Sequence, residues 1–125
     1  MEATYSPRLA PYFAVRDARG LVHFLVLGLG GKPTYEVRNP NGTPGHMEIR
    51  IGDSIVMVAE SPDGRPAFPA RMHLYVPDAK AAYEQALTIG AVGIVEPKIV
   101  ADGSERGGVR DLWGNEWWFT TLPKK

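Results

Sequence analysis

The sequence predicts an α+β fold made of two copies of one βαβββ module. The main reason is an internal repeat: residues 15–19 match residues 76–80 at an offset of 61, and each segment carries an aspartate just before an expected helix. Two expected hairpin turns, Gly52-Asp53 and Gly114-Asn115, recur at an offset of 62. The 14 glycines and 11 prolines are dispersed along the chain, which is typical of many short elements joined by tight connections.

The first module begins with a strand and a helix. Residues 9–15 are rich in β-forming side chains, and Pro11 favours a sheet edge, because proline cannot donate a ladder hydrogen bond. Asp17 is the expected N-cap of a helix that glycines terminate. Residues 46–51 alternate strictly, as in a half-buried strand. The expected elements are a strand over 9–15, a helix over 18–29, and strands over 34–37, 46–51 and 54–60.

The second module repeats this order after a proline-rich linker at residues 62–69. Asp78 is the expected N-cap of the second helix, and Gly90 ends it. A polar loop is expected over 101–108, and its glycine-bearing part at 104–108 is interpreted as a hairpin connection, with a loop that closes over a ligand as the alternative. The expected elements are a strand over 71–76, a helix over 79–89, and strands over 93–100, from 109 onward, and over 116–122.

Composition limits the classes of function. The 14 Lys and Arg residues balance the 14 Asp and Glu residues, so the chain lacks the basic footprint of a general nucleic-acid or membrane-surface binder. The absence of cysteine excludes disulfides, thiol nucleophiles and cysteine-ligated zinc. We see neither a signal-peptide pattern nor an apolar run long enough to span a bilayer. These features predict a cytoplasmic protein that binds neither nucleic acid nor membrane.

Several segments together resemble a known group of proteins. They are residues 11–13, 46–57, 73–76, 106–111 and 114–117. On these segments the chain resembles the vicinal oxygen chelate superfamily, which includes glyoxalase I, extradiol dioxygenases, fosfomycin resistance enzymes and bleomycin resistance proteins, and within it the PhnB-like group. The resemblance implies one glyoxalase/bleomycin-resistance domain over 1–125. Its modules, at about 8–61 and 70–122, would form a cup-shaped mixed β-sheet of ligand size.

The resemblance also locates a metal site, from which this sequence departs. The four ligand positions of the metal-dependent members fall at Ala10, Met57, Arg71 and Trp118. Alanine has no donor atom, tryptophan offers only an N–H, methionine is a soft ligand, and arginine carries a permanent positive charge. We therefore expect no metal and no other cofactor. An alternative, relocated metal site would use suitable ligand types at His46, Glu48 and His73.

Strand parity predicts which side chains line the cup, because successive side chains point to opposite faces. Along residues 71–76, the odd positions are amphipathic and the even positions are apolar, so the odd positions are expected to face the ligand. His46, Glu48 and Arg50 share one face of their strand, which is either further cup lining or a solvated sheet face. The predicted ligand-binding residues are Tyr12, Met57, Arg71, His73, Tyr75 and Trp118.

These residues favour binding over catalysis. Trp118 and the tyrosines would stack on a planar or aromatic organic compound, and Arg71 with His73 would anchor an acceptor or negative group. The protein would then sequester or sense that compound. A metal-dependent lyase, isomerase or dioxygenase using the relocated site is the alternative, and an assembly module with an unused cup is a third. The helix over 18–29 is apolar almost all round, which predicts a homodimer that covers it.

Overall fold

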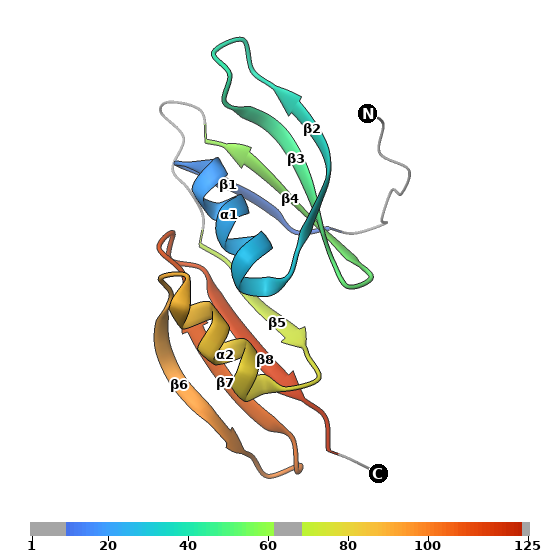
Figure 1. Cartoon of the computed structure of the whole chain (residues 1–125), viewed down its shortest axis with the longest axis vertical. Coiled ribbons are helices and arrows are strands. Elements are labelled where there is room, and N and C mark those ends of the chain that lie inside the picture. The colour runs from blue at the N-terminus through green and yellow to red at the C-terminus, as the bar shows by residue number, and fades with distance from the viewer. Residues whose placement is uncertain (1–9, 62–68, 124–125) are drawn as a thin grey trace. The chain divides into compact units, whose positions relative to one another are not determined.

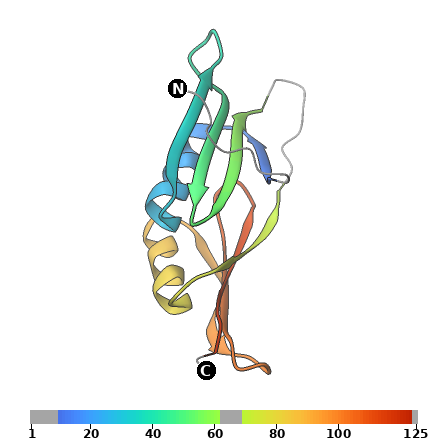
Figure 2. The ribbon, with the colours of Figure 1, turned by 90° about the vertical axis from the view of Figure 1, so that its right-hand side faces the viewer.

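The computed structural model describes residues 10–61 and 69–123. It divides the chain into two compact units, Met1–Phe68 and Pro69–Lys125, which we name unit 1 and unit 2. Each unit contains one βαβββ module, in which a helix lies against one face of a four-stranded sheet (Figures 1 and 2). The predicted fold class is therefore confirmed. The predicted linker lies outside the described residues except at its last position.

Unit 1 has the strand order β1-β4-β3-β2. Strand β1 (Tyr12–Val15) lies at the sheet edge, as predicted, and runs parallel to β4 (Ser54–Glu60). Strand β3 (Pro44–Ile51) pairs in antiparallel fashion with β4 and with β2 (Lys32–Arg38). Helix α1 (Ala18–Leu29) has the predicted bounds.

Unit 2 repeats this topology with the strand order β5-β8-β7-β6. Strand β5 (Arg71–Tyr75) runs parallel to β8 (Glu116–Thr121), and β7 (Glu105–Arg110) is antiparallel to β8 and to β6 (Val92–Ile99). Helix α2 (Ala79–Thr88) ends close to the predicted position.

One predicted loop is wrong. The chain forms a strand from Glu105, so only the beginning of the stretch over 101–108 is a connection. Gly107 and Gly108 lie in β7, and atoms of other residues occupy the space that their side chains would need. A Cβ on Gly107 would lie 2.7 Å from the Pro97 Cγ, and one on Gly108 would lie 2.6 Å from the Trp118 Cε3. These glycines therefore serve close packing across the sheet rather than a flexible lid.

The core of each unit lies between its helix and its sheet. On β1 and β5 the exposure of successive side chains alternates, in agreement with the predicted parity of these strands. The largest fully buried apolar side chains in unit 1 are Phe13, Val15, Leu21, Leu25, Ile49 and Val58. Those in unit 2 are Val109, Trp117 and Phe119.

The two helices begin with different hydrogen-bond acceptors. At α1, the Asp17 side chain accepts from the Gly20 N–H at 3.1 Å, and the Glu60 carboxylate accepts the N–H groups of Asp17 and Ala18, each at 2.9 Å. Asp17 has a left-handed backbone conformation with φ 64°, which is unusual for a residue other than glycine. Glu60, at the end of β4, thus supplies two acceptors and a negative charge to the positive end of the helix dipole.

At the start of helix α2, a threonine hydroxyl takes the place of the Glu60 carboxylate, beside an aspartate cap. The Asp78 side chain accepts from the Ala81 N–H at 3.1 Å, from an extended backbone. The Thr121 hydroxyl, at the end of β8, accepts the Ala79 N–H at 2.7 Å. Glu60 and Thr121 are 61 residues apart and occupy equivalent positions in the two repeats. The acceptor at that position is a carboxylate in unit 1 and a hydroxyl in unit 2.

A buried carboxylate organises the turn between β7 and β8. The Oδ1 atom of Asp111 accepts the backbone N–H groups of Trp113 and Asn115, each at 2.9 Å. Its Oδ2 atom accepts from the Asn115 amide at 3.0 Å and from the Trp117 indole at 2.9 Å. The Asn115 side-chain oxygen accepts the Ala70 N–H at 2.8 Å, which ties the turn to the start of β5.

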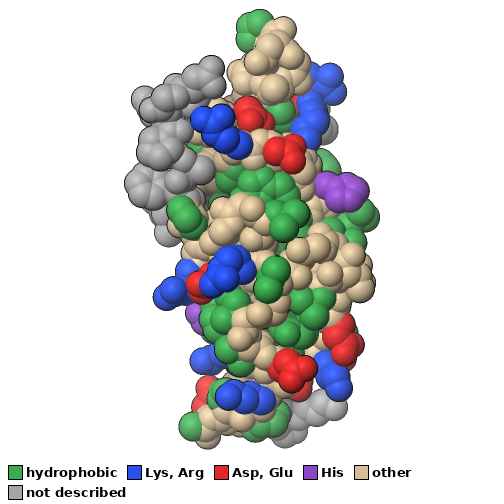
Figure 3. Space-filling view, turned by 90° about the vertical axis from the view of Figure 1, so that its left-hand side faces the viewer, with side chains coloured by type: hydrophobic (Ala, Val, Ile, Leu, Met, Phe, Trp, Pro, Cys, Tyr) green, Lys and Arg blue, Asp and Glu red, His purple; other side chains and the backbone are tan. Residues whose placement is uncertain are grey.

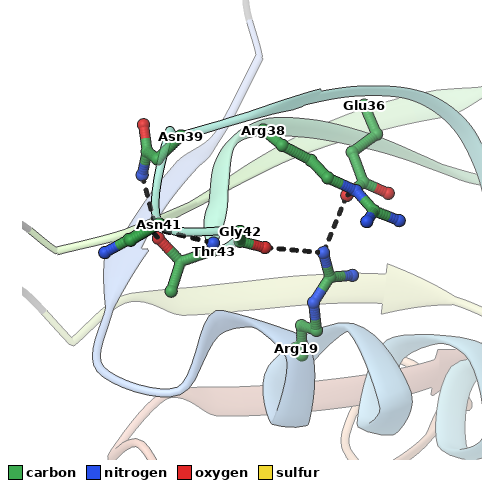
Figure 4. Close-up of polar contacts among 7 residues, drawn as sticks. All are labelled: Arg19, Glu36, Arg38, Asn39, Asn41, Gly42 and Thr43. Carbon is green, nitrogen blue, oxygen red and sulfur yellow. Dashed lines mark hydrogen bonds and ion pairs between the residues drawn. The ribbon is translucent and has the colours of Figure 1, made fainter.

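A surface ion-pair cluster joins α1 to the β2–β3 hairpin (Figure 4). Arg19 donates to the Glu36 carboxylate at 2.9 Å and to the Gly42 carbonyl at 3.3 Å, and Arg38 donates to the same carboxylate at 2.9 Å. The hydrogen bond from Arg19 is the main cause that lowers the pKa of Glu36. These groups are partly exposed, so we assign them a small share of stability.

Candidate functional site

The open face of each sheet, the one opposite its helix, carries the side chains predicted to bind a ligand. In unit 1 the register places one row across all four strands. Tyr12 on β1 pairs with Met57 on β4, Met57 pairs with Glu48 on β3, and Glu48 pairs with Tyr35 on β2. The structure therefore brings two predicted residues, Tyr12 and Met57, side by side, and adds a tyrosine that the sequence argument did not include.

His46 and Glu48 form a hydrogen-bonded pair on this face. The His46 Nε2 lies 3.1 Å from the Glu48 Oε2. Glu48 is buried at 7% exposure, whereas the His46 side chain keeps 29% of its surface exposed. The ring centroids of Tyr12 and Tyr35 lie 6.1 Å and 6.0 Å from that of His46. The imidazole is thus flanked by two aromatic rings and held by a buried carboxylate.

The open face of unit 2 is built around Trp118. His73 on β5 pairs with Trp118 on β8, which pairs with Gly108 on β7. The six-membered ring of Trp118 occupies the space that a side chain at Gly108 would fill, so the half-buried indole lies over the neighbouring strand. It forms an aromatic floor on the sheet. Arg71 and Tyr75 lie on the same face of edge strand β5, and both are exposed.

Glu116, which is not among the residues predicted from the sequence, holds this floor in place. Its Oε1 atom accepts from the Trp118 indole N–H at 3.0 Å and from the Arg71 guanidinium at 2.9 Å. The hydrogen bond from Trp118 is the main cause that lowers the pKa of Glu116, and the Arg71 contact acts in the same direction. Arg71 is thus the ion-pair partner of a carboxylate. The signal in the sequence is the two-residue spacing of Glu116 and Trp118, which puts both side chains on one face.

Basic side chains surround the Trp118 floor. Arg110 lies 3.8 Å from the Glu116 carboxylate, and Arg106 donates to the Thr120 hydroxyl at 3.4 Å. Lys98 on β6 is paired in register with Arg106. Because a loop was expected over 101–108, Arg106 could not be assigned to a sheet face from the sequence.

The expected metal positions carry no carboxylate or imidazole. Ala10 lies just before β1, and the other three positions are Met57, Arg71 and Trp118. Within residues 10–61 and 69–123, no group of three or more His, Asp and Glu side chains could hold a metal ion. Of the alternative ligand set, His46 and Glu48 are in contact in unit 1, and His73 belongs to unit 2.

Helix α1 buries one side and presents a partly apolar surface on the other. Leu21, Phe24 and Leu25 are buried, whereas Leu27 is 46% exposed. A shallow depression on this helix is lined by the exposed Arg19, His23 and Leu27, the half-buried Val26 and the buried Val22. On the side of the molecule drawn in Figure 3, hydrophobic side chains reach the surface between scattered charged groups. No helix among the described residues is long and apolar enough to cross a membrane.

Sequence comparisons find uncharacterized relatives. No protein-family model matches the chain. An uncharacterized protein of Mycobacterium tuberculosis is 27% identical over 128 residues, which span 94% of this chain and 75% of that protein. An uncharacterized protein of Mycobacterium bovis has the same identity over 94% of this chain and 84% of its own length. These similarities transfer no function.

Comparisons of structure place the fold. TioX from Micromonospora sp. ML1 superposes with a TM-score of 0.78 at 23% identity, over 93% of this chain and 98% of that one. A member of the glyoxalase/bleomycin resistance protein/dioxygenase superfamily from Sphaerobacter thermophilus gives 0.70 at 18% identity, over 95% and 99%. A glyoxalase/bleomycin resistance protein from Catenulispora acidiphila gives 0.68 at 22%, over 94% and 100%. The chain therefore has the fold of the glyoxalase/bleomycin resistance/dioxygenase superfamily.

Proposed function

We propose that this chain is a member of the vicinal oxygen chelate superfamily, in its PhnB-like group, that binds a small planar organic compound without a metal. The open sheet faces supply the binding surfaces. The observation that carries the proposal is the Trp118 indole, which lies over Gly108 as an aromatic floor with basic side chains around it. A tryptophan on the open face of a sheet offers a large apolar area for stacking, worth about 0.5–1.5 kcal/mol beyond burial alone.

Electrostatics favour a ligand with an acceptor or a negative group. Glu116 offsets part of the positive charge, because it accepts from Arg71 and lies 3.8 Å from Arg110. Arg106 and Lys98 add two further cations to the same face. A guanidinium binds carboxylate and related groups through paired, charge-assisted hydrogen bonds, each worth about 1.5–3 kcal/mol. The side chains proposed to contact ligand are Tyr12 and Met57 on the open face of unit 1, and Arg71, His73, Tyr75 and Trp118 on that of unit 2.

The proposed role is sequestration or sensing of the compound. Micromolar affinity requires about −8 kcal/mol, so stacking and apolar burial must supply most of the binding free energy. Such binding needs no chemical step. Within the superfamily that the resemblance indicates, bleomycin resistance proteins are the counterpart of this role.

Calorimetric titration with 2-naphthoate tests the proposal. We expect 2-naphthoate to bind the wild-type chain and 2-naphthylmethylammonium, its cationic counterpart, to bind at least about tenfold more weakly. Trp118→Ala should weaken both ligands, and Arg106→Gln should weaken 2-naphthoate alone. Arg38→Gln in unit 1 is the matched control and should change neither. Equal binding of the cation, or full affinity in Trp118→Ala, would refute the proposed site.

The proposed assembly is a homodimer in which a second copy covers the outer side of α1. Leu27 is 46% exposed and Val26 lines the same shallow depression, so a second copy would remove apolar area from water. Sedimentation at micromolar concentration should show a dimer, and Val26→Lys should dissociate it. Leu87→Lys on α2 is the control, because Leu87 is 38% exposed on the other helix. A wild-type monomer would contradict the dimer.

A further inference from the structure

We propose that His46 accepts a hydrogen bond from an aromatic hydroxyl group of a ligand bound on the open face of unit 1, so that this face selects phenol-type compounds. This inference rests on the proposed function and narrows it. It assigns a recognition role to the His46–Glu48 pair, which is otherwise only a contact within β3.

The buried carboxylate determines which ring nitrogen of His46 carries the proton. The Glu48 Oε2 lies 3.1 Å from the His46 Nε2, and an ionised carboxylate only accepts hydrogen bonds. With an ionised carboxylate as its partner, the Nε2 atom is the donor in this contact. In the neutral ring the other nitrogen, Nδ1, then holds a lone pair and acts as an acceptor. This is the arrangement by which a carboxylate fixes the tautomer of a functional histidine.

The contact with Glu48 uses Nε2 and does not involve Nδ1. Glu48 is the hydrogen-bond partner of His46 in the part of the chain that the structure describes, and the imidazole keeps 29% of its side-chain surface exposed. Tyr35 meets the imidazole edge-on at an interplanar angle of 67°, and Tyr12 is tilted by 36°. These rings come from β2 and β1, on either side of β3 and β4 in the sheet.

Aromatic walls and a single acceptor together define the chemistry of the ligand. The two tyrosine rings favour a flat, apolar partner, and the Nδ1 lone pair requires that this partner bring a donor. An aromatic hydroxyl satisfies both requirements, and it is a stronger donor than an aliphatic hydroxyl. Replacing the hydroxyl by a methoxy group keeps the ring and removes the donor, so the pair of compounds isolates the hydrogen bond.

The test compares 2-naphthol with 2-methoxynaphthalene by calorimetric titration of the full chain. Wild type should bind 2-naphthol about tenfold more tightly, the ratio expected for one well-placed hydrogen bond. His46→Phe keeps a ring and should remove the preference. Glu48→Gln should reduce it, because an amide can donate to Nε2 and so permits the other tautomer. His23→Phe on α1 is the matched control and should keep the preference.

Nitrogen-15 NMR of the wild-type imidazole tests the same inference without any variant. We expect the Nε2-protonated tautomer in the free chain and a shift of the Nδ1 resonance on addition of 2-naphthol. An Nδ1-protonated ring would overturn the inference, as would equal binding of the two naphthalenes. If 2-naphthoate still binds in that case, the proposed function stands and the His46 role alone is wrong. If no naphthalene binds, both are wrong.

Discussion

Units 1 and 2 share one topology, yet the middle rows of their open faces differ in character. In unit 1 the row across the first three strands is Tyr12, Met57 and Glu48, and in unit 2 it is His73, Trp118 and Gly108. Where Glu48 fills the third position, its carboxylate turns to His46. Where Gly108 leaves that position empty, the Trp118 ring occupies it. In unit 2, the missing side chain at Gly108 therefore leaves room on β7 for the ring of its neighbour Trp118.

The units also differ in what stabilises the turn between the last two strands of each sheet, β3–β4 in unit 1 and β7–β8 in unit 2. The β3–β4 hairpin of unit 1 turns through Gly52 and Asp53, both exposed, and Gly52 takes the positive φ of 60°. The β7–β8 turn of unit 2 is built on Asp111, which is 4% exposed and accepts four hydrogen bonds. Both turns contain a glycine with positive φ, Gly52 and Gly114, and unit 2 adds a buried polar network to it.

The largest expected effect is that of Asp111→Asn. Two N–H donors face each carboxylate oxygen, so the amide NH2 of asparagine would oppose two donors in either orientation. We expect a loss of about 3 kcal/mol in the free energy of unfolding, measured by denaturant titration. Asp53→Asn at the exposed β3–β4 turn of unit 1 should change the free energy of unfolding by less than about 0.5 kcal/mol. Equal losses at the two turns would contradict the view that the buried network of Asp111 sets the turn of unit 2 apart.

Substitutions of the acceptors at the helix N-termini should have the next largest effect on the free energy of unfolding. Glu60→Gln leaves one of two backbone N–H groups facing an amide NH2, and it removes the negative charge at the start of α1. We expect a loss of about 2 kcal/mol. Thr121→Val removes one hydrogen bond at the start of α2 and should cost about 1 kcal/mol. A larger effect at Thr121 than at Glu60, in the same denaturation assay, would reverse the predicted order.

Gly108→Ala should displace the aromatic floor of unit 2. The new Cβ would lie 2.6 Å from the Trp118 Cε3, so the ring has to move off β7, at a cost of about 1–2 kcal/mol. Naphthoate affinity should fall with it. In a Trp118→Ala background the same substitution should cost less, because the clash is gone. A cost that is unchanged in the double mutant would show that Trp118 does not occupy this space in solution.

The smallest effect is a pH dependence of the Trp118 position. The pKa of Glu116 is lowered from its ordinary value of 4.5, chiefly by the indole hydrogen bond. A carboxylate with a depressed pKa in the folded state stabilises the fold above its ordinary pKa, and this contribution is lost as the pH falls through the depressed value. We therefore expect the Trp118 environment to change only below about pH 4.5. Glu116→Gln should remove this transition, and a transition that persists in the variant would assign it elsewhere.

Local signals allowed much of the fold to be predicted from the sequence. Asp17 and Gly30 mark the ends of α1, because a cap side chain and a left-handed glycine act within a few residues. Parity placed Trp117 in the core and Trp118 on the open face. The start of β7 was missed because Gly107 and Gly108 look like loop residues until the bulk across the sheet is known.

The candidate site was less predictable, because its contacts depend on register. Glu116 meets Arg71 only because β5 and β8, far apart in the sequence, pair in parallel. Parity put His46 and Glu48 on one face, but the burial of Glu48 and the flanking Tyr35 come from the β2–β3 pairing. Side-chain alternation therefore predicts faces, whereas the partners on those faces require the pairing of strands.

The most direct test of the proposed binding function follows the indole N–H signals of the three tryptophans in a nitrogen-15-labelled chain during titration with 2-naphthoate. Trp118 lies on the open face, and the Trp117 indole is buried against Asp111 and serves as an internal reference. We predict that the Trp118 signal shifts progressively and saturates while the Trp117 signal stays in place. A stationary Trp118 signal at saturating 2-naphthoate would contradict the proposed site.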